Sequence, residues 1–171
     1  MGVRIVVANF IYRLLSRYGG KGVQKMAAGL VKTSENWAIL PIRLVLGTIM
    51  FAHGAQKVFG VWGGPGFNQW INQAAPFTEM RPSWLWLSAA AISEFVGGAL
   101  VLIGLYTRIG AFFIACVMLT AILGVHWNSG FFINAGGFEF PLALLGMAVA
   151  LLIHGGGSAS IDSQMSGGGK K

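Results

Sequence analysis

The chain has little charge, few acidic residues and almost no cysteine. Only 10% of its 171 residues are Asp, Glu, Lys or Arg, against about 25% in a typical soluble domain. The single cysteine, Cys116, excludes an internal disulfide and a cysteine-based metal site within one chain. Hydrophobic residues make up 55% of the sequence and the mean hydropathy is +0.68. This composition predicts an integral membrane protein with room for about four spans.

Four apolar segments are long enough to cross a bilayer. Each has roughly 17 to 22 residues, and a helix rises about 1.5 Å per residue, so each can cross a hydrocarbon core of about 30 Å. The segments are Ile39–Phe59, Trp84–Leu105, Ile109–Trp127 and Phe138–His154. Because consecutive spans have short connections, we expect an all-α fold, a transmembrane four-helix bundle of up-down-up-down topology.

Most basic residues fall on one side of the predicted membrane. They are Arg4, Arg13, Arg17, Lys21, Lys25, Lys32, Arg108, Lys170 and Lys171. The opposite loops, residues 60–83 and 128–137, contain a single basic residue, Arg81. This bias predicts both termini in the cytoplasm. We expect the bundle to lie in the bacterial or archaeal cytoplasmic membrane. Beside membrane spans, the net charge of +7 indicates membrane lipids as partners rather than nucleic acid.

Composition divides the chain into three parts. Residues 1–35 are basic, and apolar residues recur every three or four positions from Val3 to Tyr18. This pattern predicts an N-terminal amphipathic interfacial helix on the cytoplasmic surface, with a docking helix for a partner subunit as the alternative. Residues 36–155 contain the four predicted spans. Residues 156–171 are rich in Gly and Ser, which predicts a flexible tail.

Polar side chains gather toward the outer half of the predicted bundle. Ionisable groups are expensive in hydrocarbon, so they normally face the bundle interior or a wet cavity and indicate a site. Every span or its outer end contributes to this set, which comprises His53, Gln56, Lys57, Glu94, His126, Asn134 and Glu139. The spacing of His53, Gln56 and Lys57 is i, i+3 and i+4, which places them on one helical face.

Most of these side chains also have a plainer interpretation. Lys57, and Arg43 at the inner end, can extend to the headgroups. Glu139 at a helix start can interact with the helix dipole. His126 can anchor the chain at the interface, and Gln56 can bridge two helices. A functional site therefore requires these groups to converge in space.

His53 and Glu94 lie deepest and are the hardest to explain in this way. Small residues recur beside Glu94 at Ala89, Ser93 and Gly97, a spacing that lets two helices approach closely. We therefore expect Glu94 to point into the bundle. A buried His–Glu or Lys–Glu pair that serves packing alone is the alternative.

Several motifs resemble the DoxX family of small four-helix membrane proteins. In chain order they are Arg43-Leu-Val-Leu-Gly47, His53-Gly-Ala-Gln-Lys57, Trp62-Gly-Gly-Pro-Gly66, Glu94-Phe-Val-Gly-Gly98, Gly104-Leu-Tyr-Thr-Arg108, His126-Trp-Asn-Ser-Gly-Phe-Phe, Asn134-Ala-Gly-Gly-Phe-Glu-Phe-Pro141 and Ser160-Ile-Asp162. The resemblance covers about residues 40–162. It implies the four-helix architecture. Some members are subunits of a thiosulfate:quinone oxidoreductase, and others are similar to components of assemblies that handle thiol and oxidative stress. Membership of such a family predicts the architecture of a protein better than it predicts the reaction that the protein catalyses.

We therefore expect an integral membrane subunit of a redox assembly, with a quinone or small-thiol site at the outer membrane face. The predicted catalytic residues are His53, Glu94 and His126. The predicted residues that bind the cofactor, a quinone, are Gln56, Lys57, Asn134 and Glu139, and no protein-held metal is predicted. No flavin, haem-attachment or iron–sulfur motif occurs in the sequence, so electrons would come from other protein subunits.

Three other functions stay open. The chain can be a non-catalytic accessory subunit that stabilises a larger membrane complex. Transport of a small solute or proton is the second, although four helices leave little lumen. The third is a haem or metal held by His53, His126 and the carboxylates.

Overall fold

The computed structural model describes residues 21–77 and 79–167. These residues form helices and turns without a β-strand, which confirms the predicted all-helical class. The amphipathic helix predicted for residues 3–18 lies outside the described residues.

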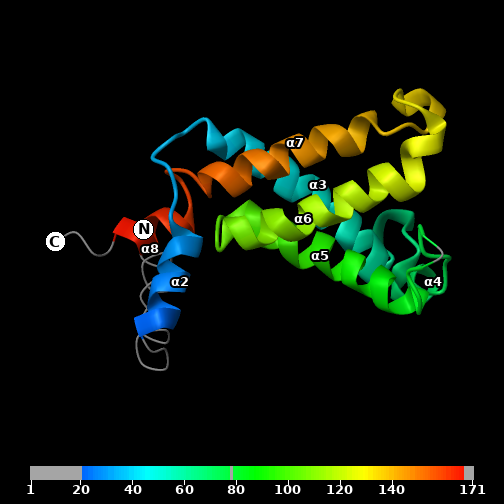
Figure 1. The fold of residues 1–171 in the computed structure, drawn as a ribbon, viewed down its shortest axis with the longest axis horizontal. Helices are drawn as coiled ribbons and strands as arrows, with labels where there is room; N and C mark the ends of the chain where they lie inside the picture. Colours follow the sequence, from blue (N-terminus) through cyan, green and yellow to red (C-terminus); the bar gives the residue numbers. More distant parts are fainter. Residues whose placement is uncertain (1–20, 78, 168–171) are drawn as a thin grey trace.

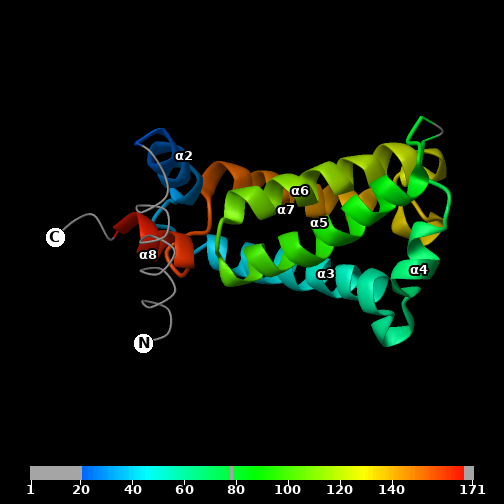
Figure 2. The ribbon, with the colours of Figure 1, turned by 90° about the horizontal axis from the view of Figure 1, so that it is seen from below.

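Four long helices lie side by side along the molecule (Figures 1 and 2). They are α3 (Ile39–Phe59), α5 (Ser83–Ile103), α6 (Thr107–Ala121) and α7 (Glu139–His154). Beyond α6, a π turn and a 3₁₀ turn continue the helical path to Ser129. With this continuation, three helices among the described residues are long and apolar enough to cross a membrane, and α7 is a shorter apolar helix. A nearly unbroken run of apolar residues thus becomes a long helix in each segment, ended at Gly60 and Gly104 by left-handed caps.

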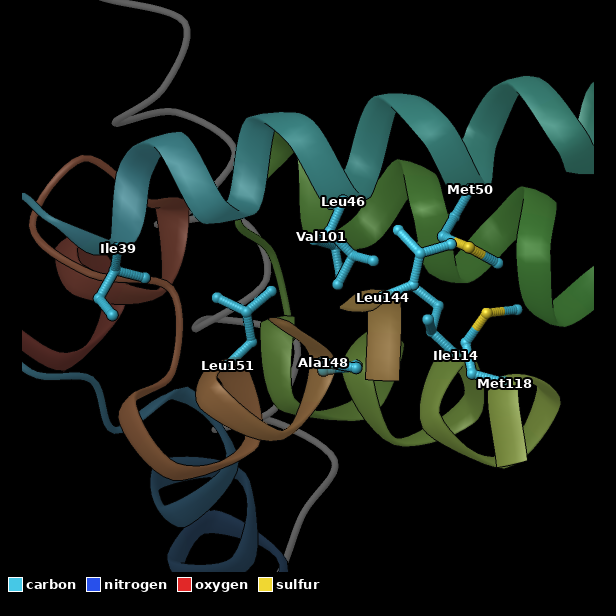
Figure 3. Packing of buried hydrophobic residues seen from close by; sticks show 10 residues of the cluster. Ile39, Leu46, Met50, Val101, Ile114, Met118, Leu144, Ala148 and Leu151 are labelled. Atoms are coloured by element: carbon cyan, nitrogen blue, oxygen red, sulfur yellow. The ribbon is translucent and has the colours of Figure 1, made fainter. Parts of the chain in front are cut away.

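The apolar core lies between these four helices (Figure 3). Its buried members include Leu46, Met50, Val101, Ile114, Leu144 and Leu151. The predicted small-residue stripe packs closely at Gly97, where a Cβ would lie 3.2 Å from the carbonyl oxygen of Gly110. Ala89, at the other end of the stripe, is exposed. Close approach of α5 and α6 therefore depends on glycine rather than on the whole stripe.

Short helices cover the two ends of the bundle (Figures 1 and 2). At one end, a 3₁₀ turn (Val61–Gly63) leads into α4 (Gly66–Ile71). At the opposite end lie α2 (Lys21–Val31) and α8 (Ile161–Gly167). The two ends are called the α4 end and the α8 end below.

The α8 end differs from the sequence-based expectation for residues 156–167. Arg43 is only 3% exposed and donates hydrogen bonds of 2.7 Å to the carbonyl oxygens of Gly156 and Ala159. It therefore points into the protein and not, as in the plainer interpretation, to the headgroups. Asp162 accepts from the backbone N–H groups of Tyr106 and Thr107 at 2.7 and 2.9 Å. These contacts fold the Gly- and Ser-rich segment against the bundle, and we call them the α8 clasp.

Candidate functional site

The centre of the candidate site is an ion pair between α3 and α5. Lys57, in the last turn of α3, directs its Nζ to Oε2 of Glu94. The Glu94 side chain is 5% exposed and that of Lys57 16%. A buried carboxylate requires such a partner, because an unpaired charge away from water is strongly destabilising. Lys57 therefore turns toward the bundle interior and does not extend to the headgroups.

Glycine residues along the α3–α5 seam bring the two charges together. A Cβ on Gly54 would overlap the backbone of Phe95. A Cβ on Gly47 would lie 2.7 Å from the backbone nitrogen of Leu102. Both contacts define one register between the helices, and that register sets Lys57 opposite Glu94 one turn beyond Gly54. The same backbone proximity that packs the helices thus makes the ion pair possible.

Helix α4 covers the ion pair from the end of the bundle. The Nζ of Lys57 lies 4.8 Å from the ring centroid of Trp70, within the range of a cation–π interaction. The indole Nε1 of Trp70 donates a 2.8 Å hydrogen bond to the carbonyl oxygen of Leu87 on α5. Gly64 allows the loop to approach α3, since a Cβ there would lie 2.7 Å from Cα of Gln56. The side chain of Gln56 faces this loop, with Nε2 3.5 Å from the carbonyl oxygen of Trp62.

Trp70 is a site residue that sequence reasoning missed. Tryptophan is common at membrane interfaces, so its presence in this part of the sequence does not by itself indicate a site. The signal that could have found it is the Gly-rich turn Gly60–Gly66, which reverses the chain over the end of α3. A short helix after such a turn can place an aromatic ring on the preceding span.

His53 lies near the ion pair but outside its packed part. It precedes Lys57 by one turn of α3, and its imidazole lies within electrostatic range of the carboxylate of Glu94. The His53 side chain is nevertheless exposed. Among the described residues it makes no side-chain hydrogen bond or ion pair. The structure thus brings together His53, Lys57 and Glu94, with only the imidazole at the protein surface.

The other predicted site residues lie in the loop between α6 and α7. The Nδ1 of His126 is 2.6 Å from the carbonyl oxygen of Gly136. The Oε2 of Glu139 accepts a 3.0 Å hydrogen bond from the backbone N–H of Ile133, and Asn134 is exposed. Neither His126 nor Glu139 makes a hydrogen bond or ion pair with Lys57 or Glu94. The predicted polar residues therefore fall into two groups. Lys57 and Glu94 pair between α3 and α5, whereas His126 and Glu139 form hydrogen bonds within the α6–α7 loop.

A hollow of about 620 Å³ opens where α4 connects to α5. Its lining is apolar apart from one arginine and one serine, and consists of Ala74, Ala75, Phe77, Arg81, Pro82 and Ser83. Its volume is in the range of small-molecule sites. Across residues 21–77 and 79–167, no three His, Cys, Asp or Glu side chains gather as metal ligands. The hollow is open to the surroundings, and neither Lys57 nor Glu94 is among the residues that line it.

Comparison with known proteins matches the chain to one family model and to two relatives. The family model described as DoxX matches residues 38–127. A relative from Bacillus subtilis (strain 168), named "Putative oxidoreductase CatD", is 33% identical over 123 residues, which are 72% of this chain and 83% of the relative. An "Uncharacterized protein" of Haemophilus influenzae (strain ATCC 51907 / DSM 11121 / KW20 / Rd) is 25% identical over 127 residues, 74% of this chain and 82% of that relative. No solved structure matches the chain.

Proposed function

The chain belongs to the DoxX family, and from this premise we propose that it is the membrane subunit of a redox assembly with a quinone or small-thiol site at its α4 end. The observation that carries this proposal is the buried Lys57–Glu94 pair beneath Trp70. Charged groups inside a membrane span are expensive and characteristic of functional sites. The relative from Bacillus subtilis, which is named as an oxidoreductase, supports the same reaction class.

In this proposal, α3, α5, α6 and α7 cross the membrane in up-down-up-down order. Three apolar helices of sufficient length and the shorter α7 support this topology. Exposed Lys25 and Lys32 lie at or near the α8 end, so the positive-inside rule favours that end and both termini in the cytoplasm. The α4 end would then face outward.

The residues at the α4 end can perform what quinone reduction requires. A quinone becomes a quinol by taking up two electrons and two protons, and the electrons would come from a partner subunit. Lys57 can donate a hydrogen bond to a ring carbonyl, because its ammonium has three donors and Glu94 engages one of them. Glu94 can pass protons toward the ring, and the indole of Trp70 offers a flat aromatic wall. A small thiol would use the same cation to stabilise its thiolate.

The experiment that tests this proposal starts with the complex purified in mild detergent, with its copurifying electron donor. We expect Glu94→Gln to lower the rate of quinone reduction about 100-fold, the typical contribution of a proton-transferring group. Ser93→Ala, one residue away on the same helix, should leave the rate unchanged. The proposal fails if a double replacement, His53→Leu with Glu94→Gln, leaves the rate unchanged and the purified protein binds no quinone.

A second candidate is a non-catalytic accessory subunit. The observation in its favour is that the family match begins at residue 38, which leaves the basic N-terminal segment free for another role. Deletion of residues 1–32 separates the two candidates. An accessory subunit should lose its partner in mild-detergent purification, whereas a catalytic subunit should keep its ligand site.

A further inference from the structure

His53 is exposed on α3, a helix that crosses the membrane in the proposed topology. It lies six residues before Phe59, the end of α3, or roughly 9 Å along the helix axis. Large apolar side chains on α3 are exposed on either side of it along the chain, with Val45 48% and Phe59 63% accessible. Such side chains suit lipid rather than water. An ionisable ring among them has no favourable solvent unless a polar ligand or protein group covers it.

Protein side chains cover much of the ion pair elsewhere, and Lys57 is 16% exposed. Trp70 lies over Lys57 and is held by its hydrogen bond to Leu87. Glu94 is 4% exposed, and Phe95, the next residue, stacks on Phe51 with ring centroids 4.8 Å apart. His53 is therefore the most exposed member of the group and the first that a ligand would meet from outside.

We propose that the site opens sideways into the bilayer at His53, and that its ligand is a lipid-soluble ring with an oxygen at its edge, such as the head of a tailed quinone. This inference rests on the proposed function and chooses between its two ligand classes. The ring oxygen satisfies the His53 imidazole and reaches toward Lys57, while the tail stays in lipid beside α3. A water-soluble thiol that approaches from the α4 end would first meet Trp70, which lies over Lys57.

The first test measures which medium surrounds position 53. Spin labels are attached to single cysteines in a Cys116→Ala background of the full chain, reconstituted in phosphatidylcholine nanodiscs. The three variants are His53→Cys, Val96→Cys on the exposed apolar face of α5, and Asn134→Cys in the exposed loop. Collisions with oxygen report lipid, and collisions with a water-soluble nickel chelate report water. We expect position 53 to match position 96. A match with position 134, or shielding from both reagents, overturns the lateral opening.

The second test measures the ligand. Decyl-ubiquinone should quench tryptophan fluorescence in a saturable way that Trp70→Phe removes. Because His53→Leu deletes one hydrogen bond to the ring, it should raise the half-saturating mole fraction in the membrane about tenfold. His53→Gln should recover part of this loss, and Val96→Leu should have no effect. Equal half-saturation in wild type and His53→Leu overturns the inference. If wild type shows no saturable quenching, the quinone function itself fails, whichever medium surrounds position 53.

Discussion

The two ends of the bundle bury charge in different ways. At the α8 end, Arg43 bonds to two backbone carbonyls and Asp162 to two backbone N–H groups. At the α4 end, the charges of Lys57 and Glu94 meet each other directly. Backbone partners have fixed positions and stabilise one arrangement of the chain. Two side chains can exchange partners, so the pair at the α4 end retains hydrogen-bonding capacity that a ligand can use.

This comparison assigns stability to one end and ligand binding to the other. In the α8 clasp, Arg43 joins segments more than 100 residues apart in sequence, and Asp162 joins segments 55 and 56 residues apart. Contacts between such distant segments stabilise the fold. The ion pair places a cation, an anion and an aromatic face within one small region. The predictions below test whether the two roles can be separated.

The largest expected effect is the loss of Arg43. Arg43→Met leaves the carbonyl oxygens of Gly156 and Ala159 without their charged donor and removes the cation near Asp162. We expect a loss of about 4 kcal/mol in the free energy of unfolding, or roughly 8 to 16 °C in Tm. Thermal unfolding followed by circular dichroism measures it. Arg108→Met is the matched control, because Arg108 donates to the single carbonyl of Ile153, and it should cost far less. Equal losses of stability in Arg43→Met and Arg108→Met would contradict a special stabilising role of the α8 clasp.

The next effect separates pairing from function at the α4 end. Lys57→Met leaves Glu94 buried without its partner and should cost about 3 kcal/mol in the free energy of unfolding. Adding Glu94→Leu should restore most of that stability, because an apolar pair can replace a buried ion pair. Denaturant titration of the single and double variants measures this. A double variant that is less stable than the single one would show that the pair is structural.

The third effect is a pH dependence at the α8 end. Burial raises the pKa of Asp162, although the N–H groups of Thr107 and Tyr106 and the charge of Arg43 act in the opposite direction. Because the folded protein holds this proton more tightly than the unfolded chain, the free energy of unfolding should rise as the pH falls through the raised pKa toward about 4. The gain is lost as the pH rises again. Asp162→Asn should remove this component, measured as the difference in Tm from wild type across pH. A difference that does not change with pH would contradict the assignment.

The smallest effect concerns the loop between α6 and α7. Glu139→Leu removes the acceptor for the N–H of Ile133 and should cost no more than about 1 kcal/mol in the free energy of unfolding. Quinone binding should not change, because Glu139 makes no hydrogen bond or ion pair with Lys57 or Glu94. Fluorescence quenching by decyl-ubiquinone checks this. Loss of quinone binding in Glu139→Leu would show that Glu139 belongs to the ligand site.

The sequence predicted the long helices well, because their signal is local. Helix α3 begins and ends at the predicted residues, Ile39 and Phe59. The partners of Arg43 could not be predicted, since the carbonyls it binds lie 113 and 116 residues away and carry no side-chain signature. A Gly- and Ser-rich composition predicts a flexible tail, and it gives no sign that an arginine elsewhere in the chain binds the backbone of that segment.

The candidate site was predictable only in part. Helical spacing placed His53 and Lys57 on one face, and the small residues of α5 pointed to close packing near Glu94. The position of Trp70 depends on the fold of the loop before α4. The separation of His126 and Glu139 from the pair depends on backbone contacts of the α6–α7 loop. Neither leaves a periodic pattern in the sequence.

The most direct test of the central claim is quinone binding by the double variant Lys57→Met with Glu94→Leu. This variant should fold with nearly the stability of wild type, so a loss of binding cannot be attributed to unfolding. Decyl-ubiquinone titration in nanodiscs should show saturable quenching in wild type and at least about tenfold weaker binding in the variant. Binding of equal strength by the two proteins would contradict the claim that the buried pair is the ligand site.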